Sequence, residues 1–394
     1  MLALLSAAEL LGMSLWFAAS AVASQLAMSW SLTDSEAAWL TTIVQLGFVC
    51  GTAAAALLNL ADILPSRLYF AAAAIMGALA NAGLIVSRGF ATALVLRFVT
   101  GVCLAGVYPP AMKMAATWFR QGRGLAIGTI VAALTVGKAT PYLLHALPAA
   151  TPSTVVLAAS GAAALAAALV AFGYRDGPYP FVRRPFSWRL AGSVVRHRET
   201  RLATAGYLGH MWELYAMWTW VPAYLAASAL ASRSGVGPRL LDLAGFAVIA
   251  VGGLGCLWGG WAAGRIGYRA VVIRAMLASG ACALVAGPAF RAPFAFVFAL
   301  ALVWGFFVVA DSAQFSALVT EVAPPHAVGT ALTLQTSIGF LLTIVTIQLV
   351  PALVSVAGWR WTVGVLALGP AAGIAAIRRL GPAHDAGRAG RAAD

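Results

Sequence analysis

Apolar residues run through this chain in long stretches, and short polar segments separate one stretch from the next. Each stretch holds about 20 residues, which as an α-helix crosses the roughly 30 Å hydrocarbon core of a bilayer. The pattern predicts an all-α integral membrane protein with twelve transmembrane helices. They cover about residues 3–26, 38–60, 67–86, 91–114, 123–147, 153–174, 201–230, 240–263, 270–290, 295–319, 327–354 and 359–377.

One polar interruption is longer and more basic than the others, and it divides the chain into two halves. The predicted organisation is an N-terminal six-helix bundle (1–174), a cytoplasmic basic linker (175–200), a C-terminal six-helix bundle (201–378) and a disordered cytoplasmic tail (379–394). Within the linker, residues 186–195 are predicted to form a short amphipathic helix on the inner leaflet, with arginines at the headgroups.

The two halves resemble each other weakly at an offset of 202 to 205 residues. Asp62 and Arg67 correspond to Gly264 and Arg269, and Trp16 corresponds to Trp218. Repeats of this kind in membrane proteins place a transport pathway at the interface between the repeats. The sequence therefore predicts two pseudo-symmetric bundles with a pathway between them.

Composition and charge support this interpretation. Of the residues, 62% are hydrophobic and 9% are charged, whereas ordinary soluble domains have roughly 25% charged residues. The net charge is +13, but 17 of the 25 Lys and Arg fall on one predicted side of the membrane. This is the positive-inside pattern. It predicts cytoplasmic termini and argues against nucleic acid as a partner. The four cysteines are dispersed in apolar helices, and neither a metal site nor a cofactor is expected.

Charged motifs at the ends of helices give the chain a family resemblance. Asp62 and Arg67 lie between predicted helices 2 and 3, Arg265 and Arg269 between helices 8 and 9, and Arg97 stands four residues before Gly101. These positions resemble the loop and helix 4 signatures of the major facilitator superfamily of secondary transporters. The resemblance implies two six-helix bundles, alternating access and a bacterial inner membrane location as a monomer.

The same motifs carry expectations about mechanism. Asp62, Arg67, Arg265 and Arg269 are predicted to form a conformational latch between the halves, since charge pairs and helix dipoles act at these helix ends. The segment 110–128 resembles branches that carry small organic anions, nitrate or cyanate. Thr140 before Pro141 departs from the Gly-Pro signature of drug/proton antiporters, which favours import by symport over efflux.

Two cations within predicted helices are candidate substrate contacts, Arg97 in helix 4 and Lys138 in helix 5. Such residues cost roughly 2.5–3.5 kcal/mol at the bilayer centre and usually face a cavity or a partner. For Arg97, the prediction is contact with an anion or a proton relay, and the alternative is a structural arginine. For Lys138, which shares a helix face with Tyr142, the prediction is binding of an anion. The alternative is a lysine that Asp311 or Glu213 neutralises.

Helix 7 carries an unusually polar and aromatic stretch, in which His210 and Glu213 share a face. A carboxylate next to an imidazole takes up and releases protons as its exposure alternates, so His210, Glu213 and Asp311 are candidate proton-coupling residues. The alternative is an internal hydrogen-bonded pair. Remaining substrate-site candidates are His210, Trp218, Trp220 and Gln314, although the tryptophans also fit an outer aromatic belt. Glu9 reads as a residue at the cytoplasmic end of helix 1.

The sequence thus predicts a secondary active transporter that moves a small, anionic solute by alternating access with proton coupling. The first alternative is a proton-coupled efflux antiporter for amphipathic compounds. Lesser alternatives are a transition-metal importer, based on soft ligands such as Cys103 and Met217, and a transporter-derived membrane receptor. No enzyme motif is recognised. The expected partners are the substrate, protons and the lipid bilayer.

Overall fold

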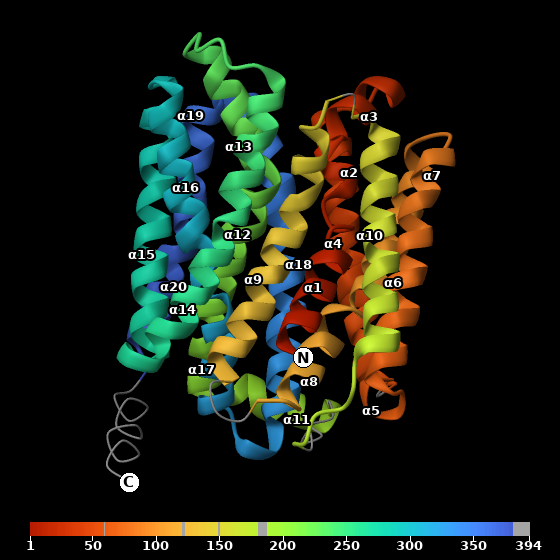
Figure 1. The fold of residues 1–394 in the computed structure, drawn as a ribbon. Coiled ribbons are helices and arrows are strands. Elements are labelled where there is room, and N and C mark those ends of the chain that lie inside the picture. Colours follow the sequence, from red (N-terminus) through yellow and green to blue (C-terminus); the bar gives the residue numbers. More distant parts are fainter. Residues whose placement is uncertain (59, 120–122, 149, 180–186, 381–394) are drawn as a thin grey trace.

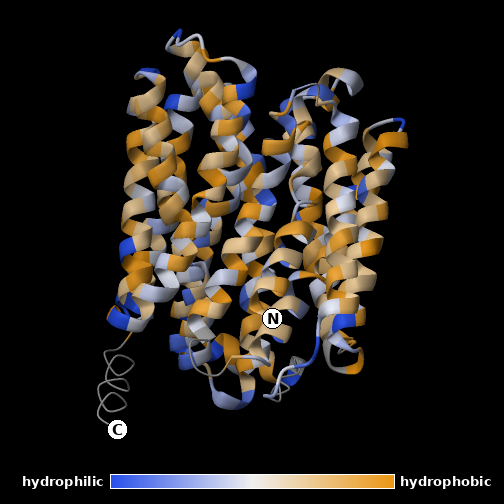
Figure 2. Cartoon of the chain, viewed as in Figure 1, coloured by the Kyte–Doolittle hydropathy of each residue, from blue (hydrophilic) through white to orange (hydrophobic). Residues whose placement is uncertain are grey.

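The structure is a computed structural model, and it describes residues 1–394 except 59, 120–122, 149, 180–186 and 381–394. Every regular element among these residues is a helix (Figure 1). Ten helical segments are long and apolar enough to cross a membrane, and Figure 2 shows apolar residues along their length. The predicted disordered tail at 381–394 lies outside the described residues.

The N-terminal half contains the first six crossings. Its helices are α1 (Leu2–Met13), α2 (Ala18–Ala21), α3 (Ala23–Trp30), α4 (Asp34–Leu57), α5 (Leu60–Ile63), α6 (Ser66–Ala82), η1 (Gly83–Val86), α7 (Phe90–Leu104), α8 (Tyr108–Ala116), α9 (Arg123–His145) and α10 (Pro152–Gly173). Crossing 1 consists of α1 to α3, and crossing 4 of α7 and α8.

The C-terminal half follows the linker helix α11 (Trp188–Arg196). Its helices are α12 (Arg198–Ala231), α13 (Pro238–Ala250), α14 (Gly252–Ile266), α15 (Tyr268–Ala286), η2 (Pro288–Arg291), α16 (Phe294–Ala310), α17 (Ser312–Val322), η3 (Pro325–Ala327), α18 (Val328–Ala357), α19 (Trp359–Thr362), η4 (Val363–Ala367) and α20 (Leu368–Arg378). The first crossing and α12 complete the twelve-helix architecture beyond the ten segments found by length and hydropathy.

Several crossings that the sequence predicts as continuous helices are interrupted. Crossing 1 breaks at residues 14–17, crossing 4 at 105–107, crossing 8 at Val251 and crossing 10 at Asp311, and η4 interrupts crossing 12. Pro109 and Pro110 begin α8 directly after the second break, where a missing backbone N–H costs least. The breaks at Gly106 and Asp311 are 205 residues apart, which agrees with the internal repeat.

The predicted linker helix is present as α11, but its apolar side does not face lipid alone. Leu190 and Val194 pack against Ala203, Val319 and Val322 of the C-terminal half. The linker helix is therefore packed onto that half.

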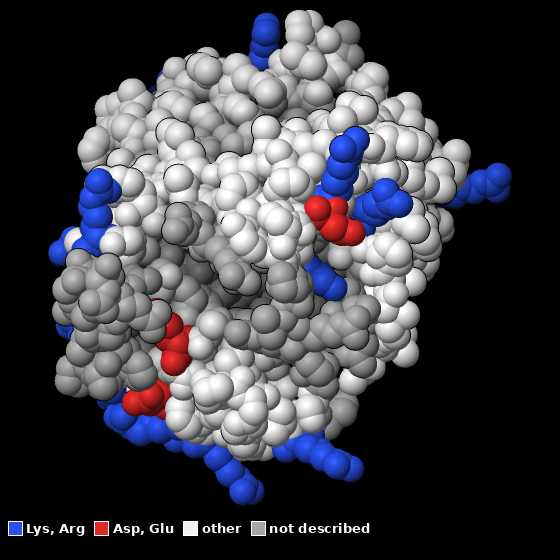
Figure 3. All heavy atoms as spheres, turned by 60° about the horizontal axis from the view of Figure 1, so that its bottom comes forward, with Lys and Arg blue, Asp and Glu red and all other residues white. Residues whose placement is uncertain are grey.

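The end of the bundle that carries α8, α11 and α17 is called the linker end here, and the opposite end is called the far end. Lys and Arg predominate over Asp and Glu on the linker end (Figure 3).

The halves meet along α9, which packs on α13 and α14, and along α4, which packs on α18. Polar contacts join the halves at the far end. Gln348 donates to the Thr42 hydroxyl over 3.0 Å and accepts from the Ser35 hydroxyl over 3.1 Å. His145 Nδ1 lies 2.9 Å from the Asp242 carboxylate. The far end is therefore closed in this structure.

Within the N-terminal half, α4 and α7 approach each other through glycines. A Cβ on Gly47 would stand 2.1 Å from the carbonyl oxygen of Phe98, and a Cβ on Gly101 would stand 2.2 Å from that of Val44. Both distances are below contact, so only glycine permits this packing. Close backbone approach through small residues is how membrane helices associate without a hydrophobic driving force.

We expect Gly47→Ala to destabilise the protein by about 1–3 kcal/mol, because the added methyl group must displace backbone. Thermal unfolding in detergent measures the effect. The matched control is Gly161→Ala on α10, where a Cβ would meet nothing within 4 Å. Equal melting temperatures for the two variants would contradict the proposed packing.

Candidate functional site

Lys138 lies at the centre of the interface between the halves. Its side chain is 1% exposed and donates to the Tyr215 hydroxyl of α12 over 2.6 Å. The ammonium nitrogen lies 3.8 Å from the centroid of the Trp16 ring and 5.3 Å from that of Trp218. Among the described residues, Lys138 forms no ion pair with Asp311 or Glu213, the partners that the sequence offered as the alternative. Lys138 is therefore enclosed by aromatic rings from both halves.

The two tryptophans beside Lys138 add further donors. The indole nitrogens of Trp16 and Trp218 are buried and have no hydrogen-bond partner among the described residues. An indole N–H only donates, and a buried donor without a partner costs about 1–3 kcal/mol. Together with Lys138, these groups form a set of donors, referred to here as the Lys138 site. A ligand that satisfies it must supply acceptors.

The break in crossing 1 positions Trp16, and Arg97 holds the break. Arg97 is fully buried. Its guanidinium donates to the carbonyl of Leu15 over 2.8 Å and to the carbonyl of Trp16. It also donates to the carbonyl of Leu40 on α4 over 3.1 Å. Because a broken helix leaves its carbonyls unpaired in an apolar interior, Arg97 supplies the missing donors. This geometry fits the structural alternative for Arg97, and a substrate contact remains a prediction.

Arg97 also joins the other helices of its half. It donates to the Asn81 side-chain oxygen over 3.3 Å, and the Asn81 amide donates to Val156 and Ser160 of α10. The guanidinium is thus connected to four other crossings. The sequence shows Arg97 within an apolar helix, four residues before Gly101, but it has no signal for the carbonyls that the break exposes.

The two acidic candidates of the C-terminal half occupy separate environments. Glu213 accepts from the Ser279 hydroxyl over 2.8 Å and from the Trp304 indole over 2.7 Å. The alternative of an internal pair between Glu213 and His210 is not found, since His210 Nδ1 lies 2.8 Å from Asp311 Oδ1 instead. The role of these residues in proton coupling stays a prediction. Asp311 occupies the break of crossing 10, which brings its carboxylate to α12. Both members of this pair are about 2% exposed.

Three other candidates lie around these centres. Tyr142 is buried and packs on Phe17 with ring centroids 6.5 Å apart, one residue beyond Trp16. Gln314 is buried, and its amide nitrogen would lie 3.2 Å from a Cβ on Gly259. Trp220 lies apart from Lys138, since its indole donates to Ile347 over 2.9 Å.

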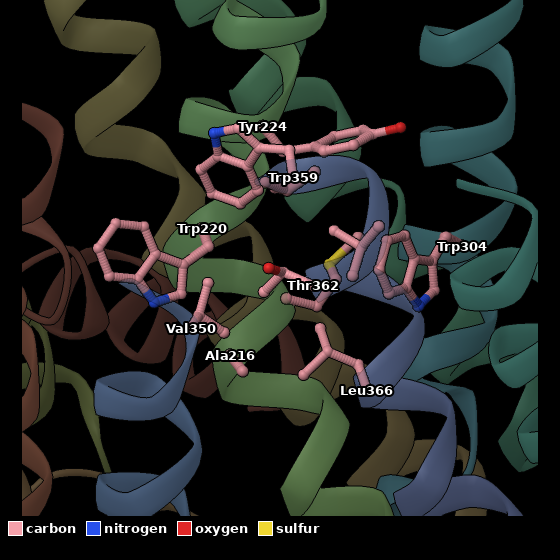
Figure 4. A pocket seen from close by; sticks show the side chains of 11 residues that line it. Ala216, Trp220, Tyr224, Trp304, Val350, Trp359, Thr362 and Leu366 are labelled. Carbon is pink, nitrogen blue, oxygen red and sulfur yellow. The ribbon is translucent and has the colours of Figure 1, made fainter. Parts of the chain in front are cut away.

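Trp220 belongs to an aromatic pocket inside the C-terminal half (Figure 4). Trp220, Tyr224, Trp304 and Trp359 surround it, with Ala216 and Leu366 on its lower side. Trp304 connects the pocket to Glu213. The wall is apolar and aromatic, so the pocket suits an uncharged group.

Of the four predicted latch residues, the two in the C-terminal half contact other residues of that same half. Arg265 stacks over the Trp261 ring at 3.9 Å, and Arg269 donates to the carbonyl of Arg378 over 2.9 Å. Arg67 is exposed, and the side chain of Asp62 lies outside the described residues. A latch between the halves therefore remains a prediction. In the described part of the chain, no three His, Cys, Asp or Glu side chains gather as a metal site.

The sequence underrated one residue. Glu9, expected at the end of helix 1, is fully buried, and neither carboxylate oxygen has a hydrogen-bond partner among the described residues. Its position in an apolar stretch was visible in the sequence, but the depth of α1 in the bundle was not.

Twelve crossings in two pseudo-symmetric halves, with buried charges at their interface, define a multi-pass membrane transporter. The chain belongs to the Major Facilitator Superfamily, whose profile matches residues 4–232. Its fold is similar to the crystal structure of a Major Facilitator Superfamily transporter, FucP, in the outward conformation. That match has a TM-score of 0.68 and 15% identity and covers 96% of this chain and 97% of the other. No protein with a curated description matched.

Family and fold confirm the predicted architecture and the transporter class, as opposed to an enzyme. The protein is a membrane-embedded secondary transporter that moves a small-molecule substrate by alternating access. In such proteins, the binding site opens to one side of the membrane at a time.

We expect Arg97→Gln to lower the melting temperature even without ligand, because it leaves carbonyls of the broken helix unpaired. Each unpaired carbonyl costs about 1–3 kcal/mol. The control is Arg88→Gln at an exposed position, which should leave the melting temperature unchanged. An unchanged melting temperature for Arg97→Gln, with ligand binding alone lost, would instead identify Arg97 as a substrate contact.

Proposed function

We propose that this transporter carries a small organic anion and that the Lys138 site binds its carboxylate or equivalent group. The observation that carries the proposal is the set of donors at the interface of the halves. Lys138 makes no direct ion pair or hydrogen bond with a carboxylate within the described residues, and two indole N–H groups beside it have no acceptor. Hydrogen bonds to charged groups contribute about 1.5–3 kcal/mol each, so an anion gains most from this site.

The rings around Lys138 suit the remainder of such a substrate. Trp16 packs on Phe48 and Phe340 at centroid distances of 5.2 and 5.9 Å, and Tyr215 packs on Phe340 at 5.3 Å. These rings come from α4, α12 and α18, so both halves contribute. A planar or compact apolar body next to the anionic group would stack on them.

The contacts at the far end indicate which conformation the structure represents, namely one that is closed at that end. Polar contacts among Ser35, Thr42 and Gln348, and between His145 and Asp242, join the halves there. We infer from the positive-inside rule that the basic linker end faces the cytoplasm. We propose that the protein lies in a bacterial inner membrane with both termini on the cytoplasmic side. Lys138 is 1% exposed in this conformation, so the site would exchange with the cytoplasm once the linker end separates.

Proton coupling is assigned to the buried acids of the C-terminal half. Asp311 interrupts crossing 10 and contacts His210 across to α12. A pair that spans two crossings changes its water exposure when the half rocks, and a titratable pair then exchanges protons. Glu213 is the second candidate, since its two donors hold it next to the aromatic pocket. We propose import by proton symport, with the protein acting as a monomer.

Efflux of amphipathic compounds is the second candidate function. The aromatic pocket of Trp220, Tyr224, Trp304 and Trp359 favours it (Figure 4), because its wall is apolar and aromatic. Its cavity volume is about 10 Å³ in this conformation, so the pocket would have to widen to bind a ring. The two functions differ in which site the ligand needs. Trp359→Ala should weaken an amphipathic ligand, whereas it should leave an anion at Lys138 unaffected.

For the anion, we expect Lys138→Gln to weaken binding about 10- to 100-fold, the equivalent of one charged hydrogen bond. A thermal-shift screen of purified protein over carboxylates, inorganic anions, amines and divalent metals identifies the ligand, and titration calorimetry gives its Kd. Lys113→Gln on α8 is the matched control and should bind normally. Stabilisation by amines or metals alone, or equal affinity in Lys138→Gln, would overturn the proposal.

For coupling, we expect Asp311→Asn to retain ligand exchange across proteoliposomes while losing accumulation driven by a pH gradient. Exchange needs only alternating access, whereas accumulation needs a proton carried with each cycle. Uptake of labelled substrate with and without the gradient measures both. Gradient-driven accumulation at the wild-type level in Asp311→Asn would assign coupling elsewhere.

A further inference from the structure

Glu9 is a buried acid that the proposed mechanism does not yet use. It lies on α1 with 0% exposure, and both carboxylate oxygens lack a hydrogen-bond partner among the described residues. An unpaired charged carboxylate in an apolar interior is costly, whereas a paired or protonated one is not. A side chain in this position is therefore sensitive to whatever charge stands next to it.

The charge next to Glu9 is Lys138. The backbones of α1 and α9 cross in close contact, since a Cβ on Gly137 would stand 2.2 Å from the carbonyl oxygen of Leu10. Glu9 and Lys138 are the direct chain neighbours of these two residues, one on each helix. The two side chains interact electrostatically across the crossing. Glu9 thus approaches from α1 the same ammonium that Trp16 and Tyr215 enclose.

Few other titratable groups act on Glu9. The helices packed against α1 are α8, α9 and α10. Tyr108 on α8 interacts electrostatically with Glu9, and α10 contains no ionisable residue. On α9, His145 lies about two turns beyond Lys138 and contacts Asp242 instead. Lys113 lies in the last turn of α8, and the side chain of Arg123 on α9 is outside the described residues. Among the described cations, Lys138 is the one whose charge acts on Glu9.

We propose that Glu9 and the substrate anion compete for Lys138, so that binding of each anion places one proton on Glu9. This inference rests on the proposed anion site at Lys138. In the empty site, the Glu9 carboxylate balances the ammonium. When the substrate carboxylate takes its place, Glu9 binds a proton and becomes a neutral carboxyl group. The site then holds one positive and one negative charge, as before.

The coupling follows from charge balance in a medium of low dielectric constant. One ammonium stabilises one carboxylate well, whereas a second carboxylate nearby disfavours its own ionised form. Release of the anion reverses the exchange, and Glu9 returns its proton on the side where the anion leaves. The anion and the proton therefore travel together. The Asp311–His210 pair would act at a separate step, the return of the empty transporter, which gradient-driven accumulation requires and ligand exchange does not.

Titration calorimetry of the purified full-length protein tests this with the anion identified in the screen. Repeating the titration in buffers of different ionisation enthalpy counts the protons taken up on binding. At a pH high enough for Glu9 to be ionised in the empty site, we expect about one proton per anion for the wild type, by linkage between the two equilibria. Glu9→Gln should bind without proton uptake and with an affinity that no longer falls as the pH rises. The control Asp34→Asn, at an exposed position at the start of α4, should still take up about one proton on binding.

The outcomes of these titrations distinguish the role of Glu9 from the anion site at Lys138. About one proton taken up by Glu9→Gln would overturn the role of Glu9 while leaving the anion site intact. Wild-type binding without proton uptake would overturn it as well, and this measurement does not depend on whether the variant folds. Anion binding that Lys138→Gln leaves unchanged would instead overturn the proposed function on which the inference rests.

Discussion

The arrangement of the central site depends on hydrogen bonds from one guanidinium to the carbonyls of a broken helix. A break inside the membrane is tolerated only where the freed backbone groups find partners. Arg97 supplies them for Leu15 and Trp16 and reaches Leu40 with its remaining nitrogen. The break at residues 14–17 directs the Trp16 ring towards Lys138. A cation in one crossing thus determines the surroundings of a cation in another.

The two buried cations of the N-terminal half therefore differ in kind. Arg97 is saturated by backbone and Asn81 and is well placed to support structure. Lys138 has one hydroxyl partner and otherwise aromatic faces. The planar guanidinium suits several fixed acceptors at once, whereas the ammonium is a compact point charge. The acids are also unequal, since Glu213 has two donors, Asp311 has an imidazole and Glu9 has only the nearby Lys138.

Much of the architecture could be predicted from the sequence, because hydropathy and charge asymmetry are local properties. Twelve crossings, two halves and the linker helix follow from them. The breaks at residues 14–17 and Asp311 could not be predicted, since an interrupted helix in a membrane is as apolar as a continuous one. The His210–Asp311 contact joins residues about 100 positions apart, and no periodicity reports it. Glu9 was underrated because its distance from the chain start says nothing of its depth.

The most direct test of the Lys138 site compares two ligands that differ in one group. Calorimetric titration of the purified transporter with the identified carboxylate and with its carboxamide keeps shape and apolar area nearly constant. A donor-only site predicts that the carboxamide binds at least about tenfold more weakly, because it removes the charge that Lys138 pairs with and adds donors of its own. Equal affinity for the two ligands would contradict an anion site at Lys138.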